Sequence, residues 1–265
     1  MLLSIRHETR YSYSHPVEYA LQKVRLTPRS DAVQTVVEWT LHADGGKAEA
    51  GYRDHYGNQT DLISANPGTT ELIIRAEGQI NTKDTAGVFG QVYGRAPLWH
   101  FQRETPQTTC NPAIRDLAAG MAEAGDRLTE LHALSASVLE AVPYETGATQ
   151  VGTTAAEALA TGKGVCQDHA HIFIAAARSA GIPARYVSGY LMMDDRADQD
   201  ASHAWAEAHI DRLGWVGFDV SNGISPDERY VRIAIGRDGA EAAPIYGLRH
   251  GTADESMIVS LQVQQ

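Results

Sequence analysis

Residues 164–180 read GVCQDHAHIFIAAARSA and place a cysteine, Cys166, in the first turn of an apolar helix. Gly181 and Pro183 mark the end of that helix, because neither residue favours its continuation. The free N–H groups and partial positive charge at a helix start stabilise an anion, so Cys166 can hold a thiolate and act as a nucleophile. A lone cysteine is more often a small buried hydrophobic residue, and we interpret Cys110 in that way.

The segments around this helix predict an α+β domain over residues 111–265. Helical periodicity and capping signals precede the cysteine, and strand patterns follow it. The expected helices begin near Asn111-Pro112, Leu128 and Thr154, and the expected strands cover 184–193, 203–210 and 214–220. Because the helices come first and the strands afterwards, the helix that carries Cys166 should pack on an antiparallel sheet.

Residues 1–82 show a different pattern, in which apolar and polar side chains alternate with the two-residue period of half-buried strands. Turn signals such as Asp44-Gly45-Gly46 separate these segments. We therefore expect an all-β, sandwich-like N-terminal domain over residues 1–82, joined to the core by a connecting segment at 83–110.

A hairpin after the helix carries a histidine and an acid, His203 and Asp219. If its turn has an odd number of residues, Trp205 stands opposite Asp219, and His203 and Asp219 are diagonal neighbours on one face, about 7 Å apart at the backbone. A carboxylate could then orient a histidine that exchanges protons with a thiol. An even turn would put the two side chains on opposite faces, and the sequence leaves both registers open.

Composition limits the partners and the compartment. The chain of 265 residues carries 22 Lys+Arg against 33 Asp+Glu, a formal charge of −11, so we expect no nucleic acid partner. No apolar run is long enough for a membrane span, and Arg6 and His7 come too early for a secretory signal. With only two cysteines, a reducing cytoplasmic location is expected. Nothing in the sequence specifies an oligomeric state.

Several of these segments together resemble a known family. The resemblance rests on Gly164–His171, Ala176–Tyr190, His203–Glu207 and Trp215–Asp219, and, for the preceding β domain, on Tyr11–Arg29 and Tyr52–Asn58. The chain is similar to the bacterial transglutaminase-like cysteine peptidases, which have a papain-like core. The resemblance implies Cys166 as nucleophile, His203 as proton carrier and Asp219 as its orienting partner. It implies no cofactor, and the calcium sites of animal transglutaminases have no counterpart here.

The implied chemistry is acyl transfer from a peptide or protein amide through a cysteine thioester. Attack by water would make the protein a peptidase or amidase, which the resemblance favours. Attack by an amine would instead make it a protein-glutamine transferase. The alternative from another class is a non-enzymatic peptide-binding module that retains the fold, because a fold alone does not prove activity.

Other polar residues near the motifs receive a structural interpretation. The spacing of His169, His171, His203 and His209 with Cys166 and Asp168 does not match zinc ligand pairs, so no metal site is expected. His171 and His209 are predicted to be structural. The aspartates at 194, 195, 198 and 200 form a solvated charge run, with attraction of basic substrates as a minor hypothesis. Trp205 either belongs to the core or shields the His203 contact, while Glu207 and Asn222 are weaker candidates, Asn222 more as a turn former than as a partner of Asp219.

Overall fold

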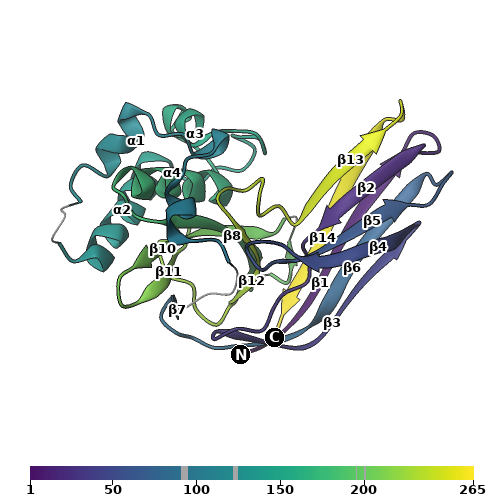
Figure 1. Cartoon of the computed structure of the whole chain (residues 1–265), viewed down its shortest axis with the longest axis horizontal. Helices are drawn as coiled ribbons and strands as arrows, with labels where there is room; N and C mark the ends of the chain where they lie inside the picture. Colours follow the sequence, from purple (N-terminus) through teal and green to yellow (C-terminus); the bar gives the residue numbers. More distant parts are fainter. Residues whose placement is uncertain (91–94, 122–124, 195, 200) are drawn as a thin grey trace.

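The computed structural model describes residues 1–265 except 91–94, 122–124, 195 and 200. It has two lobes, shown in Figure 1. Over these described residues, the β lobe consists of two antiparallel sheets, and the core lobe consists of four α-helices and a five-stranded sheet. The predicted α+β class with an N-terminal β region is confirmed. Among the described residues, no helix is long and apolar enough to cross a membrane.

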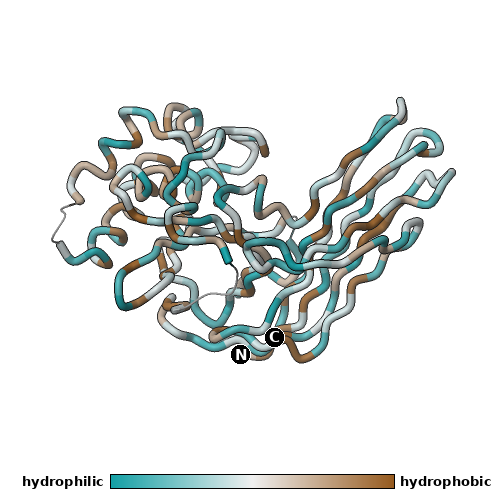
Figure 2. The backbone as a smooth tube through the Cα atoms, viewed as in Figure 1, coloured by the Kyte–Doolittle hydropathy of each residue, from teal (hydrophilic) through white to brown (hydrophobic). Residues whose placement is uncertain are grey.

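The β lobe is a sandwich whose sheets have the strand orders β3-β6-β1-β14-β9 and β13-β2-β5-β4. Buried and partly exposed residues alternate along its strands, and Figure 2 shows the matching alternation of hydropathy. The inward side chains form an apolar core between the sheets. The strands are β1 (Leu2–Tyr13), β2 (Tyr19–Val24), β3 (Gln34–Asp44), β4 (Gly46–Arg53), β5 (Gln59–Ala65), β6 (Glu71–Thr82), β9 (Asp198–Gln199), β13 (Ile245–His250) and β14 (Glu255–Gln264).

The last two strands of the chain differ from the sequence-based assignment, which gave residues 111–265 to the core. In the structure β13 pairs with β2, and β14 pairs with β1 along ten residue pairs from Ser4↔Gln264 to Tyr13↔Glu255. The chain therefore returns to the β lobe after it has completed the core. Pairing between segments so distant in the sequence leaves no local signal, so the local sequence pattern does not predict it.

The core lobe begins with two 3₁₀ turns, η1 (Leu98–Gln102) and η2 (Pro106–Thr108), and continues with α1 (Pro112–Leu117), α2 (Arg127–Ala141), α3 (Ala155–Thr161) and α4 (Cys166–Ser179). Its sheet has the order β12-β8-β10-β11-β7. The strands are β7 (Val88–Gly90), β8 (Ala184–Leu191), β10 (His203–Ile210), β11 (Gly214–Phe218) and β12 (Tyr230–Gly236). The helix expected at the cysteine and the hairpin expected after it are thus both present.

The two faces of this sheet are buried by different partners. Helix α4 packs against Ala204, Ala206 and Ala208 of β10, whose small side chains let the helix lie close to the sheet. The opposite face carries Trp205 and Trp215, which belong to a second apolar cluster. Alternate residues of β10 therefore belong to different cores, as the strand period requires.

Candidate active site

The β10–β11 hairpin brings His203 and Asp219 together. Its pairing runs from Ile210↔Gly214 to Ala206↔Phe218, so the turn contains three residues, an odd number. Continued by one pair, this register sets Trp205 opposite Asp219 and His203 diagonal to it on the same face. The His203 Nε2 and Asp219 Oδ2 atoms are 2.6 Å apart, with Asp219 fully buried and His203 nearly so.

Asp219 is held by more donors than His203 alone. The hydroxyl of Tyr230 donates to its Oδ2 atom at 2.7 Å, and the side-chain amide of Asn222 donates to the same atom at 2.7 Å. Burial by itself would raise the pKa of Asp219, but the hydrogen bonds and the charge of His203 outweigh it, so the pKa lies below its ordinary value. The carboxylate is therefore charged at neutral pH.

Cys166 interacts with the same imidazole. Burial lowers the pKa of His203, but hydrogen bonds to Asp219 and Cys166 more than compensate and raise it to about 10. Because Nε2 is bound to Asp219, Nδ1 is the ring nitrogen left for the sulfur. The order of contacts is thus sulfur, imidazole, carboxylate, with the imidazole protonated at neutral pH.

The start of α4 is fixed beside the thiol by the buried side chain of Asp168. Its Oδ2 atom accepts a hydrogen bond from the backbone N–H of Val165 at 2.8 Å and another from the hydroxyl of Thr149 at 2.5 Å. A carboxylate at the third helical position is a common N-terminal cap. It holds the first turn in place, so that Cys166 is presented at a defined end of the helix.

A cleft of about 660 Å³ opens over His203, a size that suits a binding pocket. Segments before β9, after β11 and before β12 form its walls together with Tyr144. Its lining residues are Tyr144, Leu191, Met192, Met193, Asp194, Arg196, His203, Ser221, Asn222, Ile224, Arg229 and Tyr230. Cys166 is only partly buried, and its charge influences Tyr144. The thiol therefore lies close to this cleft.

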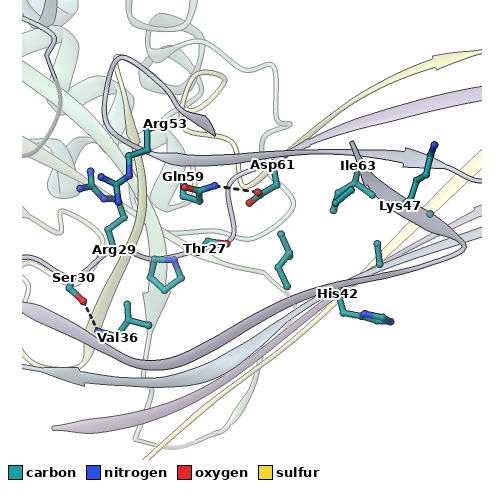
Figure 3. Close-up of a pocket in the computed structure, with 15 residues that line it drawn as sticks. Thr27, Arg29, Ser30, Val36, His42, Lys47, Arg53, Gln59, Asp61 and Ile63 are labelled. Carbon is teal, nitrogen blue, oxygen red and sulfur yellow. Dashed lines mark hydrogen bonds between the residues drawn. The ribbon is translucent and has the colours of Figure 1, made fainter. Parts of the chain in front are cut away.

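The larger cavity of about 730 Å³ is elsewhere, at the β3–β4 end of the β lobe, and Figure 3 shows it. Its lining includes Arg29, Arg53 and Asp61, and Asp61 accepts a hydrogen bond from Gln59 at 3.2 Å. None of Cys166, His203 and Asp219 lines it. Size alone therefore does not locate the reactive groups, and the cleft over His203 is the candidate site.

The remaining histidines have structural contacts. The ring nitrogens of His169 bond to Ser221 at 2.8 Å and to the carbonyl of Val142 at 2.6 Å. His171 accepts from the backbone N–H of Gly239, and burial lowers its pKa to about 3, so it is neutral. His209 packs its ring on Trp215. Among the described residues, no group of three or more His, Cys, Asp or Glu side chains is arranged to hold a metal ion.

Part of the aspartate-rich loop can be located. Asp194 is a mostly exposed ion-pair partner of Arg229 at 3.8 Å, and Asp198 accepts a hydrogen bond from Gln262 of β14 at 2.8 Å. Asp195 and Asp200 lie outside the described residues. Asp198 is thus tied to the β lobe through Gln262, while Asp194 lines the cleft.

The structure alters the interpretation of two residues and adds a third. Asn222 lies in the turn before Gly223, as expected, but its amide also donates to Asp219, the role given less weight. Glu207 is fully buried and paired with Arg185 and Arg232, away from the cleft lining. Sequence reasoning missed Tyr230, which binds Asp219 from a strand that follows the hairpin, because no local motif links the two.

Comparison with known proteins agrees with this architecture. Residues 115–220 match the transglutaminase-like superfamily, and residues 3–81 match the bacterial transglutaminase-like N-terminal region. Residues 115–220 are therefore a transglutaminase-like core, preceded by the kind of N-terminal region found in bacterial transglutaminase-like proteins. The matched core contains Cys166, His203 and Asp219, whereas Tyr230 lies beyond its end.

Other proteins are similar to this chain along nearly its whole length. An uncharacterized protein of Mycobacterium leprae is 27% identical over 278 residues, covering 98% of each chain. An uncharacterized protein of Mycobacterium tuberculosis is 29% identical over 288 residues, covering 98% of this chain and 91% of its own. A crystal structure described as a "putative cysteine protease" from Cytophaga hutchinsonii covers 100% of this chain and 91% of its own, with a TM-score of 0.79 at 21% identity. That likeness shows that the two-lobe fold is shared.

Proposed function

We propose that the protein is a thiol-dependent acyl-transfer enzyme, and that it hydrolyses peptide or isopeptide amides. The observation that carries the proposal is the series of contacts from the Cys166 thiol through the His203 imidazole to the buried Asp219 carboxylate. In this series Cys166 is the nucleophile, His203 carries the proton and Asp219 orients and stabilises the imidazolium. Tyr230 and Asn222 are positioning residues, because they act through Asp219.

The reaction follows from these positions. The Cys166 thiolate attacks the carbonyl carbon of the amide, and backbone N–H groups at the start of α4 stabilise the oxyanion that forms. His203 gives its Nδ1 proton to the amide nitrogen, the C–N bond breaks, the amine leaves and a thioester remains. His203 then takes a proton from water as the water oxygen attacks the thioester carbon, and the C–S bond breaks to release the acid.

Hydrolysis is favoured over amine transfer because water can reach the reacting atoms. Cys166 is only partly buried, Tyr144 beside it is about half exposed, and polar side chains such as Ser221 and Arg196 line the cleft. Amine transfer needs a site that excludes competing water. A protein-glutamine transferase is therefore the second candidate. We expect the enzyme in the cytoplasm, because both cysteines are free thiols, as is usual in a reducing compartment.

Intact-mass spectrometry tests the proposal. The protein is incubated with glutamine-containing and isopeptide-linked peptides in water enriched in ¹⁸O, with an added primary amine. We expect an acyl adduct that disappears in Cys166→Ala but persists in Cys110→Ala, and products that carry ¹⁸O. Incorporation of the amine in place of ¹⁸O would identify a transferase.

Alkylation by iodoacetamide separates the enzyme from a non-enzymatic binding module. An activated thiol in Cys166 should react faster than Cys110 well below the ordinary thiol pKa of about 8.5. Equal, slow reaction of both cysteines, together with no adduct, would exclude a catalytic role for Cys166.

A further inference from the structure

One edge of the β lobe is left open next to the candidate site. Strand β14 pairs with β1 along its whole length, but on its other side, among the described residues, only Leu261 and Gln262 pair with β9. Within the described part of the chain, no strand lies against residues 255–260 on that side. A strand edge of this kind offers unpaired backbone N–H and C=O groups to another chain.

The open edge of β14 lies next to the chain segment that forms one wall of the cleft. Met192, Met193 and Arg196 line the cleft, and the same segment continues directly into β9 on β14. Met192 also packs against the apolar cluster that contains Leu261 of β14. His203, the first residue of β10, follows Gln199 by four residues in the sequence. An extended segment placed beside residues 255–260 would therefore continue the line of β9 and lie next to the approach to His203.

The backbone direction of this edge is set by a contact that the chain already makes. The N–H of Val263 donates to the carbonyl of Ala197 at 3.1 Å, on the β9 side of β14. Because N–H directions alternate along a strand, the N–H groups of Val259 and Met257 point to the same side. β9 thus occupies one end of a ladder, and no other strand of the described residues pairs with its remaining positions.

The side chains of this edge also favour a peptide. Met257 is 57% exposed and Ile258 is 64% exposed, so both faces of β14 carry accessible apolar surface there. Tyr246 and Leu248 of β13, at the same edge of the sandwich, are 62% and 61% exposed; Figure 1 shows these strands on the side of the β lobe nearest the core lobe. Residues 255–260 contain no lysine or proline, the residues that commonly protect edge strands.

We propose that an extended polypeptide segment of the substrate binds β14 at residues 255–260 as an added strand and is led from there to Cys166. The inference rests on the proposed function and narrows its substrate class to unfolded or flexible polypeptides, in preference to small amides. Backbone pairing gives affinity with little sequence preference, and the exposed apolar residues favour hydrophobic side chains in the segment.

Amide hydrogen exchange tests binding without turnover. Cys166→Ala protein is mixed with dimethylated casein, a disordered polypeptide that suits recognition through the backbone. We expect slower exchange in residues 255–260 and no change in β4, an edge strand of the other sheet. Unchanged exchange at 255–260 with casein in large excess would overturn the proposal.

Kinetics of two variants at one position test the route to the thiol. Val259→Pro removes an N–H from the open side, which an edge strand tolerates, whereas Val259→Ala keeps the N–H and only shortens the side chain. We expect Val259→Pro to lower kcat/KM about tenfold for casein and less than about twofold for benzyloxycarbonyl-glutaminylglycine, with Val259→Ala near wild type on both. Equal losses on both substrates would overturn the edge proposal. Inactivity of the wild-type protein on both would refute the proposed function, and the exchange result would still decide whether the edge binds peptide.

Discussion

Two titratable side chains on one face of β10 have different surroundings. His203 and Glu207 are four residues apart, both are buried, and each is bound to an opposite charge. His203 has Asp219 on one side and the partly buried thiol of Cys166 on the other. Glu207 is enclosed by two arginines, one of which stacks on Trp215 at 3.8 Å from the ring centre.

The contacts of Glu207 serve the fold. Arg185 donates to its Oε2 atom at 2.6 Å, and Arg232 lies 3.0 Å from Oε1. Arg232 also pairs with Asp31 of the β lobe at 3.1 Å, so the network joins the two lobes. Glu207 is therefore fixed by its two arginine partners, whereas His203 has one ring nitrogen available for proton transfer. An ion pair is thus available for chemistry only where one side of it reaches a cleft.

The largest effect is expected at the His203–Asp219 pair, which reaches the cleft. His203→Gln removes the proton carrier and should lower the rate of thioester formation about 1,000-fold or more, since groups that act as a unit with a nucleophile have effects of this size. The unfolding temperature should also fall, because buried Asp219 loses its countercharge, so the rate is compared per folded molecule. Single-turnover kinetics and thermal unfolding of the same preparation measure both. A variant that keeps most of its activity would show that another group carries the proton.

The buried contacts of Glu207 with Arg185 and Arg232 should give the opposite result. Glu207→Gln leaves Arg185 and Arg232 without their buried countercharge, and breaking a buried ion pair in this way costs about 3–5 kcal/mol of unfolding free energy. The active-site contacts are made by other residues, so the folded fraction should keep kcat near wild type. Urea unfolding and active-site titration give the two quantities. Unchanged stability with reduced kcat would assign Glu207 to the site.

The dependence of stability on pH distinguishes a charged His203 from a neutral one. Its pKa is raised to about 10 in the folded protein, against 6.5 when unfolded, so between these values the folded state holds a proton that the unfolded state lacks. The stabilisation is therefore complete below pH 6.5 and is lost as pH rises through about 10, at a slope of at most about 1.4 kcal/mol per pH unit. Urea unfolding of wild type and His203→Gln from pH 6 to pH 10 should show the difference shrinking. A constant difference would mean that His203 is neutral.

Local signals explain how much of the fold could be predicted from sequence. The helix Cys166–Ser179 and the hairpin strands were expected because periodicity and capping residues act within a few positions. The register of the hairpin could not be predicted from the sequence. Its three-residue turn relies on a left-handed backbone conformation at Arg212 and at Gly214, and arginine is not a residue type that indicates this conformation.

Tertiary pairing explains what could not be predicted. Strand β13 pairs with β2 and strand β14 pairs with β1, more than 200 residues away in the sequence. The open edge of β14 depends on the same pairing. Of the candidate site, Cys166, His203 and Asp219 were named from motifs, and the structure pairs His203 with Asp219 beside the cleft. Their catalytic roles stay predictions.

The smallest effect is expected at Tyr230, the residue found only in the structure. Tyr230→Phe removes one of three donors to Asp219 Oδ2 and leaves His203 and Asn222 in place, so kcat should fall about tenfold, as for the loss of one hydrogen bond to a charged group. Tyr190→Phe is a matched control, because Tyr190 is equally buried and its hydroxyl bonds to His7 at 2.9 Å, away from the thiol. The control should lose stability but no activity. A positioning role for Tyr230 also requires the pKa of His203, measured by NMR, to shift in Tyr230→Phe. A purely structural role would change the unfolding temperature of both variants alike and leave that pKa where it is.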